Sequence, residues 1–333
     1  MKVSASGVRV LAVVAVLGVT GSISGVSAQS PAPSPSSAGD ITIGFSVPAV
    51  DDYYGVVRDS FVAAAEAQGV AYLEGNGDGA GDPTQQIAKI ETMLAQGIDV
   101  LAVAPPGDAF IPVLDRAKEL GVKVIFIDQQ VPDWEGESTF IATDNPAGSQ
   151  LLGDYLVGKL EAGDQVGIMI GIPGIPLLFD RYNNFKTTLE AAGITVTLTS
   201  EADGCQLDTA VNVARNFIVA NPDLDAIYAT CGPTGVAVTQ VLQEQGNPAL
   251  SLTWDVPVQQ INDILDGKAT AAVAQFPQRL GENAVAYALK VAAGEEVPAY
   301  VDNGTEIVTI ENAGEFFHEG STGYSYKLAS PAP

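Results

Sequence analysis

The sequence is short of the residues that most catalytic centres need. It contains a single histidine, His318, and two cysteines, Cys205 and Cys231. Zinc sites built on histidine, and triads with a histidine base, are therefore almost excluded. The sequence also lacks the Gly-x-x-x-x-Gly-Lys-Ser/Thr loop of nucleotide-binding proteins and the Gly-x-Ser-x-Gly turn of serine hydrolases. We expect no catalytic residues, no metal and no cofactor.

Basic residues are also scarce. The chain has 15 Lys and Arg residues against 40 Asp and Glu residues, which gives a net charge of −25. A surface this acidic repels phosphate backbones and anionic lipid headgroups. We expect neither nucleic acid nor a membrane surface as a partner, and we interpret the excess acid as keeping the protein in solution.

The apolar run near the N-terminus, residues 11–20, is too short to cross a bilayer. It follows the basic Lys2 and Arg9 and precedes the small residues at 26–28. This order is typical of a secretory signal peptide, which we assign to residues 1–28; the alternative is a buried N-terminal helix. No cysteine lies near the expected cleavage site. We therefore expect an exported protein, periplasmic or extracytoplasmic, that is soluble and has no lipid anchor.

Proline and serine alternate after this segment, so we assign residues 29–40 to a Ser/Pro-rich linker. Residues 329–333 are expected to form a frayed tail. With 47% hydrophobic residues, the chain has enough apolar material for one large domain or two lobes of ordinary size.

Short β-branched runs alternate with longer amphipathic stretches along the middle of the chain. Most of the short runs are almost continuously apolar, as in strands covered on both faces of a parallel sheet. Strands are predicted at 41–46, 71–74, 100–104, 123–127, 139–142, 165–170, 195–199, 226–229, 250–254 and 271–274. Helices are predicted at 54–68, 83–96 (with Asp82 as N-cap), 109–120, 146–160, 183–192, 209–220, 234–245, 257–266 and 280–293. The alternation predicts a doubly wound α/β fold, and the number of strands favours two similar lobes with a cleft between them.

Polar and aromatic side chains follow the carboxyl ends of these strands, where ligands bind in open α/β sheets. They are Asp51, Asp52, Tyr53, Tyr54, Asp128, Gln129, Arg181, Cys231, Asp255 and Gln275. Carboxylates and amides form paired hydrogen bonds with hydroxyl groups, and aromatic rings cover the C–H faces of sugars. The set would suit a polyhydroxylated neutral molecule.

Each of these residues also has a purely structural explanation. The alternatives are helix caps for Asp51, Asp52 and Asp255, core packing for Tyr53 and Tyr54, and a solvated position at a helix start for Arg181. A binding site is favoured because all of the residues fall at the same end of successive strands.

Several short motifs occur in a fixed order between residues 41 and 311. They are Ile43-Gly44-Phe45-Ser46 with Tyr53-Tyr54, Asp82-Pro83-Thr84-Gln85-Gln86 with Gln96-Gly97-Ile98-Asp99-Val100, Gly121-Val122-Lys123-Val124 with Ile127-Asp128, Ile141-Ala142-Thr143-Asp144-Asn145, Asn221-Pro222-Asp223, Trp254-Asp255 and Val273-Ala274-Gln275. The ordered set resembles the type I periplasmic sugar-binding proteins, the substrate-binding components of ABC importers. The likeness is greatest to the ribose-binding type.

The resemblance implies a role for each matching residue. Tyr53 and Tyr54 stand where the family has stacking aromatics, and Asp128 stands at the carboxylate that bonds adjacent sugar hydroxyls. The further hydrogen-bonding positions are Asp51, Arg181, Asp255 and Gln275.

Other positions depart from the family pattern. Gln129 replaces an arginine, which removes a charge and a bidentate donor. Cys231 replaces an asparagine that bonds the ligand, and Cys205 falls near a position that is often aromatic. Both cysteines thus map to one wall of one lobe, and we predict a disulfide between them rather than two free thiols. These departures make another pentose, a hexose or a sugar alcohol as suitable a ligand as ribose.

The resemblance also implies two lobes joined by a three-stranded hinge, with crossings near Asn145, Gln275 and Thr305. The segments are 41–144 with 276–305 for the N-terminal lobe and 145–275 with 306–328 for the C-terminal lobe. Closure of the hinge would trap the sugar or polyol, and an ABC permease would then recognise the closed form. We expect the protein to be a monomer.

Three other functions share parts of this pattern. A sensor for chemotaxis would use the same binding event. A transcriptional regulator with this fold would need a DNA-binding helix-turn-helix where the signal peptide and linker stand. A cleft enzyme would use Cys231 as a nucleophile or Asp128 with Asp255 as an acid–base pair, which the remote His318 and the predicted disulfide disfavour.

Overall fold

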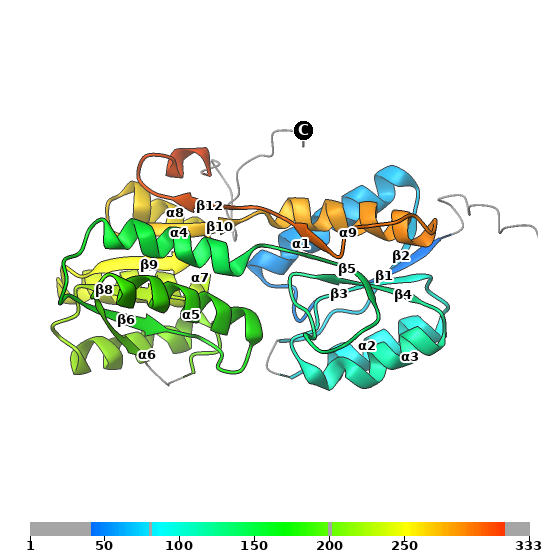
Figure 1. Ribbon diagram of the computed structural model, residues 1–333, viewed down its shortest axis with the longest axis horizontal. Helices are drawn as coiled ribbons and strands as arrows, with labels where there is room; N and C mark the ends of the chain where they lie inside the picture. The colour runs from blue at the N-terminus through cyan, green and yellow to red at the C-terminus, as the bar shows by residue number, and fades with distance from the viewer. Residues whose placement is uncertain (1–40, 80–81, 199–201, 317–333) are drawn as a thin grey trace, which may run out of the picture. The chain divides into compact units, whose positions relative to one another are not determined.

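The computed structural model describes residues 41–79, 82–198 and 202–316. The expected signal peptide, linker and C-terminal tail lie outside these residues, as does His318. Within the described ranges, no helix is both long enough and apolar enough to span a membrane. The described residues form two α/β lobes, each built on a six-stranded sheet (Figure 1).

The first lobe is a parallel sheet with the strand order β11-β5-β4-β3-β1-β2. Its strands are β1 (Thr42–Ser46), β2 (Ala71–Glu74), β3 (Val100–Val103), β4 (Lys123–Ile127), β5 (Glu137–Ala142) and β11 (Tyr300–Asp302). Its helices are α1 (Asp52–Gln68), α2 (Thr84–Ala95), α3 (Ile111–Glu119) and α9 (Pro277–Ala292), with a 3-10 turn η2 (Asp108–Phe110) before α3. Helices α1 and α9 cover one face of the sheet, and α2 and α3 cover the other (Figure 1).

The second lobe repeats this plan with the strand order β12-β10-β9-β8-β6-β7. Its strands are β6 (Gln165–Met169), β7 (Thr195–Leu198), β8 (Ala226–Ala229), β9 (Leu250–Trp254), β10 (Ala271–Gln275) and β12 (Thr305–Val308), of which β12 is antiparallel to β10. Its helices are α4 (Asn145–Val157), α5 (Pro176–Ala191), α6 (Leu207–Ala220), α7 (Gly232–Gln245) and α8 (Val258–Leu265), followed by a 3-10 turn η3 (Ala313–Glu315). Helices α4 and α5 pack on one face, and α6 and α7 pack on the other. The predicted doubly wound α/β fold with two similar lobes is confirmed.

The first lobe is completed by α9, which comes from late in the chain and packs closely on α1. At Gly281 of α9, an added Cβ would collide with the carbonyl oxygen of Val57 and the amide nitrogen of Phe61. Val57 and Phe61 are themselves fully buried. The missing side chain of Gly281 therefore allows the two helix backbones to approach and joins distant parts of the chain in one core.

The helix starts in the described residues differ from the predicted ones by one to three residues, except in α5, where the difference is seven residues. Helix α5 begins at Pro176 rather than at residue 183, so Arg181 lies inside the helix. Proline is favourable there because its missing N–H would have no partner in the first turn. Helix α2 begins at Thr84, with Pro83 rather than Asp82 as its N-cap, although the Asp82 carboxylate still accepts the Thr84 N–H at 3.0 Å.

The described chain passes between the lobes before α4, after β10 and between β11 and β12. The fully buried Asn303 ties these three segments together. Its backbone N–H donates to the carbonyl oxygen of Ala142 at 2.8 Å, and its side-chain Nδ2 donates to the carbonyl oxygen of Phe276 at 2.8 Å. Thr305, placed by the sequence in the first lobe, is the first residue of β12 in the second sheet.

We expect Asn303→Ala to lower the free energy of unfolding by about 1–3 kcal/mol, because it removes both side-chain hydrogen bonds of a fully buried residue, from its Nδ2 to the carbonyl oxygen of Phe276 and from Asn283 Nδ2 to its Oδ1. Chemical denaturation monitored by circular dichroism would measure the change. Asn212→Ala is the matched control, since Asn212 is exposed on α6 and its side chain bonds only the carbonyl oxygen of Asp208 in the same helix. Equal losses in the two variants would contradict a special role for Asn303.

Candidate ligand-binding site

A cavity of about 720 Å³ lies at the carboxyl ends of strands from both sheets. Its volume falls in the range typical of sites for small molecules. The predicted ligand residues all line it, namely Asp51, Tyr53, Tyr54, Asp128, Gln129, Arg181, Cys231, Asp255 and Gln275. The strand-end rule thus predicts residues that the fold brings together, while their contact with a ligand stays a prediction.

Asp128 and Asp255 occupy equivalent places in the two lobes, each directly after the fourth strand of its lobe. Both have a left-handed backbone, with φ of 61° and 69°, which aspartate tolerates better than most residues. The N–H of Asp128 donates to the carbonyl oxygen of Ile141 at 2.8 Å, and that of Asp255 donates to the carbonyl oxygen of Val273 at 2.9 Å. The same backbone turn therefore delivers a carboxylate to the cavity from each lobe.

In the first lobe, Asp128 is buried and accepts hydrogen bonds from both tyrosines. Tyr54 Oη donates to Asp128 Oδ2 at 2.6 Å, and Tyr53 Oη lies 3.3 Å from Asp128 Oδ1. Gln129 Nε2 donates to Tyr54 Oη at 2.7 Å. Burial raises the pKa of Asp128, while the Tyr54 hydroxyl and the Arg181 charge oppose this shift. Burial and the neighbouring Asp128 also raise the pKa of Tyr54, so its hydroxyl stays a donor.

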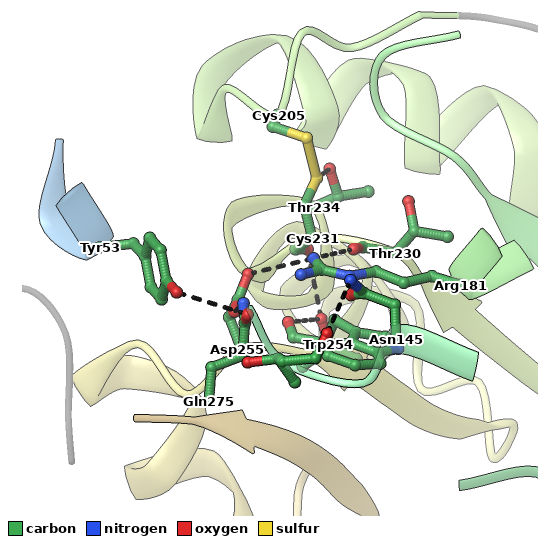
Figure 2. A network of polar contacts seen from close by, with 12 residues as sticks. Tyr53, Asn145, Arg181, Cys205, Thr230, Cys231, Thr234, Trp254, Asp255 and Gln275 are labelled. Atoms are coloured by element: carbon green, nitrogen blue, oxygen red, sulfur yellow. Dashed lines mark hydrogen bonds and ion pairs between the residues drawn. A yellow bond between two sulfur atoms is a disulfide. The ribbon is translucent and has the colours of Figure 1, made fainter. Parts of the chain in front are cut away.

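In the second lobe, Arg181 is only 3% exposed and is held from several sides (Figure 2). Its Nε donates to Asn145 Oδ1 at 2.8 Å, and its guanidinium also donates to the carbonyl oxygen of Thr230 at 3.1 Å. The guanidinium lies 4.1 Å from the ring centroid of Trp254, and one nitrogen is 3.8 Å from Asp255 Oδ2. A guanidinium fixed in this way is a preorganised donor, and the solvated position considered from the sequence is wrong.

Gln275 and Tyr53 connect the residues around Asp128 in the first lobe with the residues around Arg181 in the second lobe. Gln275 Nε2 donates to Asp255 Oδ1 at 2.6 Å, and the Tyr53 hydroxyl lies 3.4 Å from Gln275 Oε1 (Figure 2). Because one hydroxyl has one hydrogen, Tyr53 can donate to Asp128 or to Gln275 at a given moment. Polar contacts therefore connect Tyr54 to Arg181 along the cavity, through hydrogen bonds and, between Asp255 and Arg181, through an ion pair.

Asp51 combines two of the roles considered from the sequence. Its Oδ1 accepts the Tyr54 N–H at 2.8 Å as the N-cap of α1, and the residue also lines the cavity. The surrounding protein removes water from its carboxyl group and raises its pKa to about 6, and the nearby charge of Asp255 adds to this shift. Asp52 is the first residue of α1 rather than its cap, and Asp255 does not cap α8, whose N-cap is Pro257.

The predicted disulfide between Cys205 and Cys231 is present, with 6.1 Å between the two Cα atoms. It joins the residues just before α6 to the N-cap residue of α7. Asp203 and the two sulfur atoms are also close enough together to hold a metal ion. Since both sulfur atoms are bonded to each other, they offer no thiolate, and we assign no metal to this cluster.

The carboxylates among the described lining residues outnumber the basic groups. Asp51, Asp52, Asp128 and Asp255 line the cavity together with Arg181. Arg181 is already engaged by Asp255 at 3.8 Å. An anionic ligand would meet net repulsion in this cavity, whereas hydroxyl donors would find several acceptors.

Sequence reasoning missed the residues that support the site from behind. Asn145 and Trp254 fix the guanidinium of Arg181. The sequence alone predicts Asn145 only as a hinge residue and Trp254 only as the end of a strand. The apolar lining from the starts of α5, α6 and α7 is also missed. The signal that could have found it is the apolar character of residues 175–178, 207 and 233–236, at the strand ends of the second lobe.

Comparison with known proteins gives consistent matches. Residues 43–296 match a family model described as the periplasmic binding protein domain. The chain is 27% identical over 240 residues to the D-ribose/D-allose-binding protein of Pseudomonas aeruginosa, covering 68% of this chain and 75% of that protein.

Two solved structures share the fold along most of their length. An ABC transporter solute binding protein from Mycobacterium smegmatis with bound glycerol has a TM-score of 0.79 and 28% identity, covering 86% of this chain and 99% of that one. A carbohydrate transporter solute binding protein from Agrobacterium radiobacter, in complex with D-arabinose, has a TM-score of 0.76 and 26% identity, covering 82% and 95%.

Members of the matched family are binding proteins, and the match spans most of the described residues. The site fits that description, since its polar groups converge on one cavity and hold one another in place. The chain belongs to the periplasmic binding protein family, as its ordered motifs predict.

Proposed function

We propose that this chain is an exported solute-binding protein that captures one small neutral sugar or sugar alcohol and delivers it to an ABC permease. The single observation that carries the proposal is the shared cavity, in which a continuous polar network offers carboxylate acceptors beside a fixed guanidinium donor. The relatives support it, because one is named for D-ribose and D-allose and similar structures hold glycerol and D-arabinose.

The proposed mechanism is closure of the hinge around the ligand. Residues from both lobes line the cavity, so a ligand that bonds both lobes favours the closed arrangement. Closure removes water, which strengthens each hydrogen bond and penalises any polar group left without a partner. Selectivity then depends on matching every hydroxyl with an acceptor or donor of the network. The permease would recognise the closed form, with the protein acting as a monomer.

A screen of pentoses, hexoses and sugar alcohols by thermal unfolding, followed by calorimetry, tests the proposal. We expect at least one neutral compound to bind with a stoichiometry of one and to raise Tm, since a ligand at about 100 times its Kd adds about 2.7 kcal/mol to the stability. The matched sugar acid should bind at least about tenfold more weakly, because the cavity carries excess carboxylate. Tighter binding of the acid, or no binding of any neutral compound, would contradict the proposal.

A further inference from the structure

The cavity also has a chemically different region beside the polar network. We call it the apolar wall and define it by Ile172, Ile175, Leu178, Leu207, Pro233 and Val236. All six residues belong to the second lobe, in the loop before α5 and in the first turns of α5, α6 and α7. The polar network, by contrast, draws on both lobes. A ligand in this cavity therefore has one polar environment and one apolar environment.

The apolar wall is formed by three helix starts that carry no polar cap. The N-cap residues of α5, α6 and α7 are Ile175, Gln206 and Cys231, and none accepts a side-chain cap hydrogen bond. Helix starts usually favour Ser, Thr, Asp or Asn. Helices α1 and α4 follow that preference, with Asp51 and Asp144 as their N-caps. The starts of α5, α6 and α7 instead carry the apolar residues Ile175, Leu207 and Pro233 at the N-cap position or within two residues after it.

The disulfide fixes this wall in position. Cys205 lies two residues before Leu207, and Cys231 lies two residues before Pro233, so the bond holds the starts of α6 and α7 together. Gly171 packs beneath it with φ +78, and a Cβ there would lie 2.6 Å and 2.8 Å from the two sulfur atoms. A wall tied covalently and packed from below cannot easily move away from an unsuitable ligand.

The residues of the apolar wall differ in exposure, and Leu207 has the largest surface left to contact a ligand. Leu207 is 43% exposed, whereas Leu178 and Val236 are already packed by their neighbours. A ligand hydroxyl placed against such a surface would lose its water without gaining a partner. A methyl or larger apolar group in the same place would bury apolar area and gain free energy. The wall therefore discriminates between a ligand face rich in hydroxyls and one rich in C–H groups.

We propose that the ligand is amphipathic: a sugar or sugar alcohol with a deoxy carbon, or an alkyl or aryl substituent, that faces the apolar wall. The proposal rests on the proposed sugar-binding function. It adds that the hydroxyl-bearing side of the ligand bonds the polar network while its apolar group contacts α5, α6 and α7.

Matched pairs of compounds test this inference by calorimetry. The pairs are D-galactose with D-fucose, L-mannose with L-rhamnose, galactitol with L-fucitol, and methyl with phenyl β-D-glucopyranoside. We expect the more apolar member to bind at least about tenfold tighter in every pair that binds, the scale that one buried apolar group provides. If the less apolar member of each pair binds equally well or more tightly, the inference about the apolar wall is wrong, whereas the proposed function still holds. If neither these pairs nor the broader screen yields a ligand, the proposed function fails and this inference fails with it.

Two variants separate the wall from a general effect on folding. Val236→Thr adds a hydroxyl at nearly constant volume, and Leu207→Gln changes a residue that is 43% exposed and leaves the core intact. Both should reduce the preference within a pair to less than about threefold. Val219→Thr, at a position 67% exposed on α6, is the control and should keep the full preference. An unchanged preference in both wall variants would overturn the inference.

Discussion

Asp128→Ala should weaken binding of the cognate sugar or polyol by more than about tenfold. Its carboxylate is the common acceptor for Tyr54 at 2.6 Å and Tyr53 at 3.3 Å, so its loss leaves two cavity hydroxyls and the ligand without that acceptor. Hydrogen bonds to charged groups contribute about 1.5–3 kcal/mol, which corresponds to roughly 10- to 150-fold in Kd. Calorimetry with the best ligand of the screen would measure the loss. Unchanged affinity would remove Asp128 from the site.

Asp128→Asn distinguishes lost binding from lost folding. Because burial raises the pKa of Asp128 above the ordinary value of 3.8, the folded protein holds this proton more tightly than the unfolded chain does. Ionisation of Asp128 therefore lowers the free energy of unfolding as the pH rises from 3.8 through the raised pKa. Above that pKa the whole of this destabilisation is present. We expect Asp128→Asn at pH 7 to be at least as stable as the parent while binding more weakly.

Thermal melts at pH 7 and pH 5 check the sign of this effect. The Tm of the parent minus that of Asp128→Asn should increase as the pH falls, because the parent recovers the cost of its buried charge. Asp223→Asn, an exposed substitution before β8, is the matched control for affinity and for stability at both pH values. A variant that binds normally, or one whose melting difference moves the other way, would contradict the role given to Asp128.

The strands of the two sheets were largely predictable because they are buried on both faces. The runs at β4 and β8 are almost entirely apolar, and the run at β9 alternates apolar residues with Ser251 and Thr253. All three runs end at polar or turn residues, and their observed bounds equal the predicted ones. The short strands β11 and β12 have no such signal. They form by pairing with β5 and β10, which lie far away in the sequence. Tertiary contacts, rather than local preference, decide their structure.

The site was predictable to the extent that it follows from topology. Parallel strands end at one edge of a sheet, so a sequence that marks strand ends also marks the cavity lining. The orientation of individual groups does not follow from that rule. The bond between Arg181 and Asn145 depends on the packing of α5 beside α4, and Asp51 both caps α1 and lines the cavity. Pairing of this kind is fixed only when the helices are placed.

Replacing both cysteines by serine should lower the free energy of unfolding by about 3–4 kcal/mol, the value that the chain-entropy model gives for a closed loop of this size. Cys205 and Cys231 are 26 residues apart, so the bond restricts a sizeable part of the unfolded chain. Urea denaturation of Cys205→Ser/Cys231→Ser and of the oxidised parent would measure the loss. The urea m-value should also rise, because the unlinked unfolded chain exposes more surface.

A second pair of replacements separates this effect from local packing. Cys205→Ala/Cys231→Ala removes the same cross-link without placing hydroxyls beside Gly171 and Thr234, whose Oγ1 lies 3.2 Å from Cys231 Sγ. If restriction of the unfolded chain dominates, the serine and alanine variants lose similar stability, and a loss below about 1 kcal/mol in both would contradict it. In both variants the affinity for apolar ligands should fall more than the affinity for hydroxylated ones, because the bond holds together the starts of α6 and α7, which carry part of the apolar wall.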